Sequence, residues 1–148
     1  GSGNSGMLVT EVKKQMKSAA AQVDLAIIDG SPGIGCPVIA SLSGVDIVLI
    51  VAEPSLSGIS DMERIIKTAQ AFQVKIAVCI NKYDINNDNT EKIEQFCQKQ
   101  KLPLVGKIPF DSGAVKAINN GKTIVDIDYS SGRAVREIFD QTMKLLLC

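Results

Sequence analysis

The segment V-K-I-A-V-C-I occupies residues 74–80 of this 148-residue chain, and N-K-Y-D follows it directly at residues 81–84. Apart from Lys75, the side chains of the segment are all apolar, without alternation between polar and apolar positions. A strand that faces solvent on one side alternates, whereas a strand of a parallel sheet is covered on both faces and is apolar throughout. The segment therefore predicts a buried parallel strand with a polar group at its carboxyl end.

Similar apolar runs occur elsewhere along the chain, at residues 23–28, 45–52 and 104–108. Between the runs, apolar side chains recur at helical spacing. The predicted helices cover about 9–19, 59–72, 90–101 and 131–147, with a short one after Asp111. Alternating strands and helices predict an α/β fold, a three-layer and mostly parallel sheet with helices on both faces. Residues 4–148 are expected to form a single domain, and Gly1-Ser2-Gly3 has the pattern of a cloning scar.

The composition limits the chemistry and the partners of the chain. Sixteen Lys and Arg balance sixteen Asp and Glu, so we expect neither a nucleic acid nor a membrane as partner, since both need a basic surplus. Histidine is absent, which removes the commonest general base. The four cysteines form no C-x-x-C pair, so no metal site is expected within this chain. Few cysteines and no signal-peptide pattern predict a cytoplasmic protein.

Polar and glycine-rich residues follow the predicted strands, and ligands of such sheets bind beyond the carboxyl ends of the strands. The first run leads into D-G-S-P-G-I-G at residues 29–35. A carboxylate here can hold Mg²⁺ through water or orient a water, and Asp29 is therefore the candidate catalytic and metal-binding residue. Gly33 is a candidate for close approach to a phosphate. The alternative is that Asp29 only caps a turn.

The predicted strands at 74–80 and 104–108 supply the candidates for binding a base. The Asn81 amide can both donate to and accept from a purine edge, and the stem of Lys82 can lie along a base. Pro109, Phe110 and Asp111 follow the next strand and can frame a base with backbone groups. A polar turn is the plain alternative for residues 81–84, because Asn and Asp favour turns.

The segment from Glu53 to Asp61 is a longer connection into a helix. It is a candidate for sensing the nucleotide or for a subunit contact. A simple strand-to-helix connection with a capping box explains it equally well.

Taken together, D-G-S-P-G-I-G at 29–35, E-P-S-L-S-G at 53–58, N-K-Y-D at 81–84 and I-P-F-D at 108–111 resemble the MinD/ParA superfamily of P-loop ATPases. The likeness is strongest to MinD-like ATPases that carry an inserted ferredoxin module with [4Fe-4S] clusters. The resemblance implies that Asp29 lies near Mg²⁺ and the hydrolytic water, that Asn81 contacts adenine, and that Pro109 to Asp111 line the base pocket. It also implies ATP and Mg²⁺ as ligands, and a homodimer or another form of self-association.

The chain departs from this family in one respect, because it contains no phosphate-binding loop of the type G-x-x-x-x-G-K-[ST]. Such a loop supplies most of the phosphate binding in these folds. We therefore expect the chain to be the C-terminal portion of a longer ATPase, inactive alone, with the N-terminal half of the domain as its partner. Neither ATP nor an iron–sulfur cluster is expected to bind to it by itself.

Two other functions fit parts of the sequence. Asn81-Lys82-Tyr83-Asp84 matches the N-K-x-D of GTP-binding proteins, although Pro32 stands where a D-x-x-G switch would have glycine. The chain could also be a non-catalytic α/β interaction module.

Overall fold

The structure is a computed structural model that describes residues 25–30, 42–123 and 130–148. Its described strands are β1 (Ile47–Ala52), β2 (Lys75–Asn81) and β3 (Leu104–Ile108), which form a parallel sheet in the order β1-β2-β3. The helices between them are α3 (Leu56–Ala71) and α4 (Asn87–Lys99), and β3 is followed by α5 (Ser112–Asn119) and α6 (Ser130–Leu147). The predicted α/β fold is confirmed, and three predicted strands lie within two residues of their expected bounds.

The central strand β2 is the most deeply buried part of the described chain. Its residues from Ile76 to Ile80 are all buried, and it pairs with β1 on one side and β3 on the other. This burial explains the continuous apolar run, because a strand between two helical layers has no face left for polar side chains.

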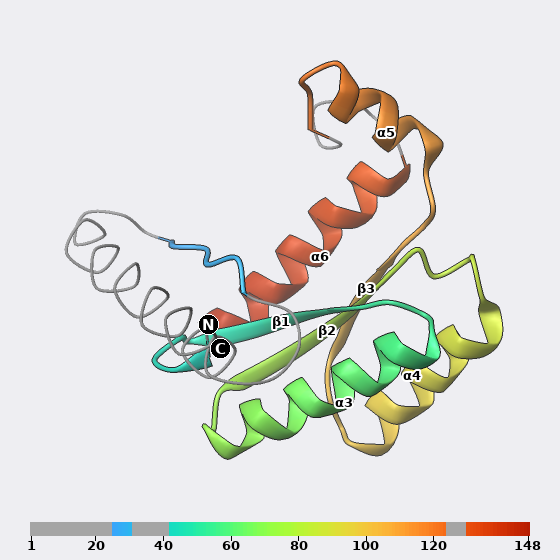
Figure 1. Cartoon of the computed structure of the whole chain (residues 1–148). Helices are drawn as coiled ribbons and strands as arrows, with labels where there is room; N and C mark the ends of the chain where they lie inside the picture. Colours follow the sequence, from blue (N-terminus) through green and yellow to red (C-terminus); the bar gives the residue numbers. More distant parts are fainter. Residues whose placement is uncertain (1–24, 31–41, 124–129) are drawn as a thin grey trace, which may run out of the picture.

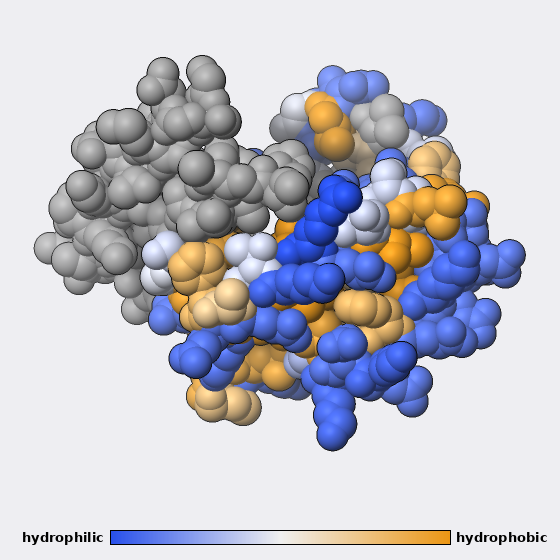
Figure 2. All heavy atoms as spheres, turned by 60° about the horizontal axis from the view of Figure 1, so that its bottom comes forward, coloured by the Kyte–Doolittle hydropathy of each residue, from blue (hydrophilic) through white to orange (hydrophobic). Residues whose placement is uncertain are grey.

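Helices α3 and α4 cover the same face of the sheet (Figure 1). Their buried side chains Met62, Ile66, Ile93 and Cys97 join Ile50, Val78 and Ile80 in one hydrophobic cluster. Both crossovers move in the same direction along the sheet, and crossovers of one hand then put their helices on one face. Figure 2 shows the outer side of this layer, where hydrophilic side chains predominate and hydrophobic areas lie between them.

Helix α6 covers the opposite face of the sheet (Figure 1). Its Ile138 packs in a second cluster with Ala77, Cys79 and Val105. The carboxyl end of α6 is fastened to the start of β2, because Lys75 Nζ donates to the carbonyl oxygens of Leu145 (3.1 Å) and Cys148 (2.8 Å). A cation at this end of a helix also interacts favourably with the helix dipole.

The prediction of a strand at residues 23–28 is wrong for the part that the structure describes. Residues 25–28 are described and are not in a strand, and the Ile27 side chain is 79% exposed. A strand needs a neighbour for its backbone N–H and C=O groups, and no described strand pairs with these residues. The predicted helix at 9–19 lies outside the described residues.

Strand β1 also differs from expectation, because it is buried on one face only. Ile50 and Ala52 are buried against the layer of α3 and α4, whereas Leu49 is 36% and Val51 54% exposed on the α6 side. β1 lies at an edge of the described sheet, and α6 packs chiefly over β2 and β3. The apolar run at 45–52 thus predicted a second covered face that the described residues do not provide.

The close approach of α6 to β3 depends on Gly106, where a Cβ would lie 2.5 Å from Ile138 Cγ1. Glycine inside a strand normally costs about 0.5–1 kcal/mol relative to alanine. We expect the reverse here, with Gly106→Ala lowering the free energy of unfolding by about 1–3 kcal/mol because the added methyl overpacks the contact. Urea denaturation measures this change.

Ile138→Ala supplies the matched background for this substitution, since it removes the atoms that the new methyl would meet. In that background Gly106→Ala should cost clearly less, which a double-mutant cycle measures. An equal cost in both backgrounds would contradict this explanation of Gly106.

Candidate functional site

The three parallel strands end at the same edge of the sheet. Asn81, the last residue of β2, and the residues that follow the strands form what we call the rim: Glu53, Asn81 to Asp84, and Pro109 to Asp111. Ala52 of β1 pairs with Ile80 of β2, so the residues next to them in sequence, Glu53 and Asn81, lie side by side. Asn81 Nδ2 donates a hydrogen bond to Glu53 Oε1 over 3.2 Å. The end of β1 is therefore connected to the end of β2 through these two side chains.

A second set of contacts connects the loop after β2 with the loop after β3. Asp84 Oδ1 accepts a hydrogen bond from the backbone N–H of Phe110 over 2.8 Å, and the Tyr83 N–H donates to the Ile108 carbonyl oxygen over 3.1 Å. The buried Thr90 of α4 donates its hydroxyl to the Tyr83 carbonyl oxygen over 2.6 Å. These bonds hold residues 83–84 and 108–110 in one fixed arrangement.

The exposed residues of 81–84 and 109–110 are Lys82, Asp84 and Phe110. Lys82 has φ of 51°, a left-handed conformation that turns the chain sharply after β2. The Phe110 ring is 56% exposed although its backbone is fixed by Asp84. An exposed aromatic ring can contact a flat heterocycle.

Asp111 makes its contacts inside the protein. It is the N-cap of α5, where Oδ1 accepts from the Gly113 N–H (2.9 Å), while Oδ2 accepts from the Ser131 hydroxyl (2.8 Å) and N–H (3.3 Å). These donors, the Ser131 hydroxyl foremost, together with the charge of Arg133, lower the pKa of Asp111 below its usual value. Asp111 thus joins the start of α5 to the start of α6, and its predicted contact with a nucleotide stays a prediction.

Of the two remaining predicted residues, only Asp29 is described, and it stands apart from the rim. Asp29 is exposed at the end of residues 25–30, which Figure 1 draws in blue away from the loops that follow β1, β2 and β3. Gly33 lies outside the described residues. The structure therefore brings together Asn81, Lys82, Pro109 and Phe110, but it does not bring Asp29 to them.

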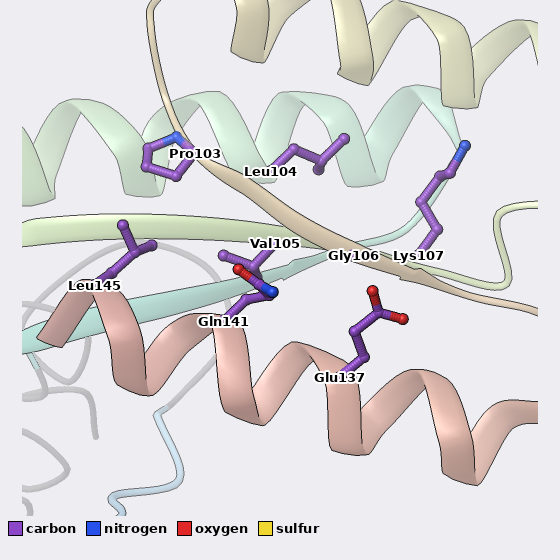
Figure 3. Close-up of a pocket in the computed structure, with 8 residues that line it drawn as sticks. All are labelled: Pro103, Leu104, Val105, Gly106, Lys107, Glu137, Gln141 and Leu145. Carbon is purple, nitrogen blue, oxygen red and sulfur yellow. The ribbon is translucent and has the colours of Figure 1, made fainter.

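A groove of about 430 Å³ lies between β3 and α6, away from the rim. Figure 3 shows Gln141 and Glu137 of α6 beside Val105 and Gly106 of β3. Within the described ranges, no group of three or more His, Cys, Asp or Glu side chains could hold a metal ion. Cys79 of β2 is buried in the cluster beneath α6, and this burial raises the pKa of its thiol to about 11. It is thus a neutral packing residue at physiological pH.

Glu53 is the site residue whose contact the sequence analysis missed. The motif E-P-S-L-S-G predicts a connection that senses nucleotide or contacts a subunit, or equally a simple strand-to-helix connection, and neither interpretation links Glu53 to Asn81. The signal lies in the register of the sheet, which no local sequence pattern contains. Ala52 pairs with Ile80, so the next residues, the carboxylate of Glu53 and the amide of Asn81, lie side by side.

Comparison with known proteins gives the family of the chain. Residues 4–124 match the CbiA family, the CobQ/CobB/MinD/ParA nucleotide binding domain. The uncharacterized protein MJ0578 of Methanocaldococcus jannaschii is 30% identical over 146 residues, which cover 99% of this chain and 49% of that protein. The septum site-determining protein MinD of Helicobacter pylori is 26% identical over 80% of this chain and 48% of its own length. The chain belongs to the CobQ/CobB/MinD/ParA nucleotide-binding domain family.

Solved structures agree on the fold. MinD of Aquifex aeolicus superposes with a TM-score of 0.74 at 22% identity, covering 94% of this chain and 61% of that one. MinD of Pyrococcus horikoshii, solved in complex with Mg-ADP, gives a TM-score of 0.75 at 18% identity, covering 93% and 56%. The chain spans about half the length of the curated relatives that it matches. None of the described helices combines the length and the apolar character needed to cross a membrane.

The contacts of Asp111 predict a pH-dependent contribution to stability. Because its pKa is lowered in the folded protein, the carboxylate stabilises the fold above the unfolded pKa of about 3.9, and this stabilisation is lost as the pH falls through the folded pKa. Asp111→Asn should lower the free energy of unfolding at pH 7, and its difference from the wild type should shrink toward pH 3. Urea denaturation across this pH range measures both effects.

Asp140→Asn, an exposed substitution on α6 that removes the same charge, is the control and should leave the pH dependence as it is. A wild-type pH dependence in Asp111→Asn would mean that the Ser131 and Gly113 bonds do not stabilise the folded carboxylate.

Proposed function

We propose that the chain supplies the adenine-binding side of an ATP-binding MinD/ParA-type ATPase domain, in a longer protein that contributes the phosphate-binding loop. The observation that carries the proposal is the bonded rim, in which Asn81 ends β2, Phe110 follows β3, and the two are held by Glu53 and Asp84. An adenine edge offers one donor and one acceptor, and a single amide can satisfy both. The residues of the rim therefore fit an adenine base.

The family of the chain favours ATP over GTP, since its relatives include a protein of Methanocaldococcus jannaschii named as ATP-binding. Asp84 Oδ1 accepts the Phe110 N–H, and the carboxylate thus serves to join the two loops. The alternative as a GTP-binding protein is also weakened by Pro32, which stands where a D-x-x-G switch would have glycine.

Asp29 is proposed to act in the complete domain as the switch aspartate that holds Mg²⁺ through water. Magnesium neutralises charge on the transferred phosphoryl group, and an exposed carboxylate is a suitable ligand for a hydrated Mg²⁺ ion. We further propose that Gly33 lies beside the phosphates and that residues 25–30 become a strand when a neighbouring strand is supplied. The [4Fe-4S] linkage of the full protein stays a prediction from the resemblance.

Self-association is proposed for the chain in isolation. β1 has an unpaired edge in the described sheet, with Leu49 and Val51 exposed beside it, and exposed edges of this kind pair with other chains. In the complete domain the remaining residues of the longer protein would cover this edge, and ATP-dependent dimers would then form through other surfaces.

A chimaera tests this function, with the present chain replacing the matching part of MJ0578. We expect the chimaera to bind ATP with a Kd near the micromolar level, and the 148-residue chain alone to bind it no tighter than about millimolar, because the phosphate loop is absent. Isothermal titration calorimetry measures both. In the chimaera, Asp29→Asn should reduce hydrolysis more than binding.

MJ0578 itself is the matched control for expression and for nucleotide binding. Micromolar ATP binding by the chain alone would contradict the division of the site between two parts. So would a folded chimaera that binds no ATP while MJ0578 does. Sedimentation should show larger species for the chain alone than for the chimaera, and a chain that stays monomeric at high concentration would refute the open-edge proposal.

A further inference from the structure

Glu53 is the only rim residue described here whose carboxylate faces Asn81 and whose bond to it is a charge-assisted one. The bond joins two strand ends that are already aligned by the pairing of Ala52 with Ile80. An ionised carboxylate only accepts hydrogen bonds, so the group that faces Glu53 must be the Asn81 NH₂. The Asn81 carbonyl oxygen Oδ1 therefore faces away from Glu53.

This direction matters because an asparagine without such a partner can present either end. A rotation of 180° about its last side-chain bond exchanges the oxygen and the nitrogen with almost no change in shape. The sequence alone leaves the two orientations equivalent. The Glu53 carboxylate removes this ambiguity, since the flipped amide would place one oxygen against another.

The backbone of Glu53 is itself held in place. Its carbonyl oxygen accepts from the Ser55 N–H over 2.9 Å, and Gly58 packs so closely that a Cβ there would lie 2.5 Å from that oxygen and 2.9 Å from Glu53 Cβ. The next residue, Pro54, is buried, and its carbonyl oxygen accepts from Asn89 Nδ2 over 3.3 Å. The exposed carboxylate thus extends from a fixed point beside Asn81.

Purines differ at the position that such an amide would read. Adenine carries an amino donor at C6, whereas guanine and hypoxanthine carry an oxygen acceptor there, and all three have an acceptor at N7. An outward Oδ1 can accept from the 6-amino group, while the second hydrogen of Nδ2 can reach N7. A 6-oxo purine would instead place its acceptor against Oδ1.

The geometry points to Glu53 as a positioning residue that fixes the Asn81 amide in the orientation that selects 6-amino over 6-oxo purines. This inference rests on the proposed function, because it assumes that Asn81 meets a purine. It assigns the choice between adenine and guanine to a residue that does not itself touch the base.

Titration calorimetry of the chimaera with ATP and with ITP tests the inference, because the 148-residue chain alone is not expected to bind nucleotide tightly. ITP is the matched probe because its base has oxygen at C6 but lacks the 2-amino group of guanine. With Glu53 intact, the Kd of the chimaera for ITP should be at least about tenfold higher than its Kd for ATP. In Glu53→Leu, the amide can rotate, and the ratio of the two affinities should fall toward one.

Glu53→Gln should give an intermediate ratio, since its side-chain oxygen still accepts from Asn81 but its own NH₂ also tolerates the flipped amide. Glu63→Gln on α3 removes the same charge without touching the Glu53–Asn81 bond, and its ratio should equal that of the wild type. An unchanged ratio in Glu53→Leu would overturn the role of Glu53 while leaving adenine binding intact. A folded chimaera that binds neither nucleotide would overturn the proposed function, and this inference with it.

Discussion

The rest of the structure depends on the burial of β2 between two helical layers and two strands. Its residues Ile76 to Ile80 are buried without interruption, and a strand with no exposed face can be placed only at the centre of a covered sheet. That position forces β1 and β3 to pair on either side and puts α3 and α4 opposite α6. Because all three strands are parallel, their carboxyl ends meet at one edge, and Asn81 stands in the middle of it.

Polar contacts join the loops of the rim, and Tyr83 also packs against the hydrophobic cluster of α3 and α4. Carboxylates of Glu53 and Asp84 each hold a donor of a neighbouring loop, and Asp111 holds the starts of two helices. Hydrogen bonds to charged groups are stronger than neutral ones, which suits loops that have little hydrophobic area of their own. The arrangement leaves the Asn81 carbonyl oxygen, the Lys82 side chain and the Phe110 ring as the groups that can meet a ligand. It also separates residues that build the site from residues that contact the ligand, a distinction that the motifs alone do not make.

The sequence predicted the strands that pair within the described sheet, but not the absence of a strand at residues 25–28, which have no described partner. Residues 74–80 and 104–108 are predicted as strands because each is an apolar run of strand length. Helix α6 is predicted from its apolar stripe. Residues 23–28 have the same apolar character, yet the described part of them is no strand, because hydrogen-bond pairing is a property of the sheet and not of the run. The pairing of Glu53 with Asn81 required the register of β1 against β2, which no local pattern contains. Asp111 was selected for its place after a strand, and its bonds to Gly113 and Ser131 became apparent only once α6 was positioned.

Photoaffinity labelling with 2-azidoadenosine tests most directly whether the rim is where an adenine base binds. This probe keeps the 6-amino group and attaches covalently to whatever surrounds the base, so mass spectrometry of the labelled peptides reports the site without any substitution in the chain. The account predicts label in residues 81–84 and 108–111, displaced by excess adenosine. Label concentrated in the groove between β3 and α6, or label that adenosine does not displace, would contradict it.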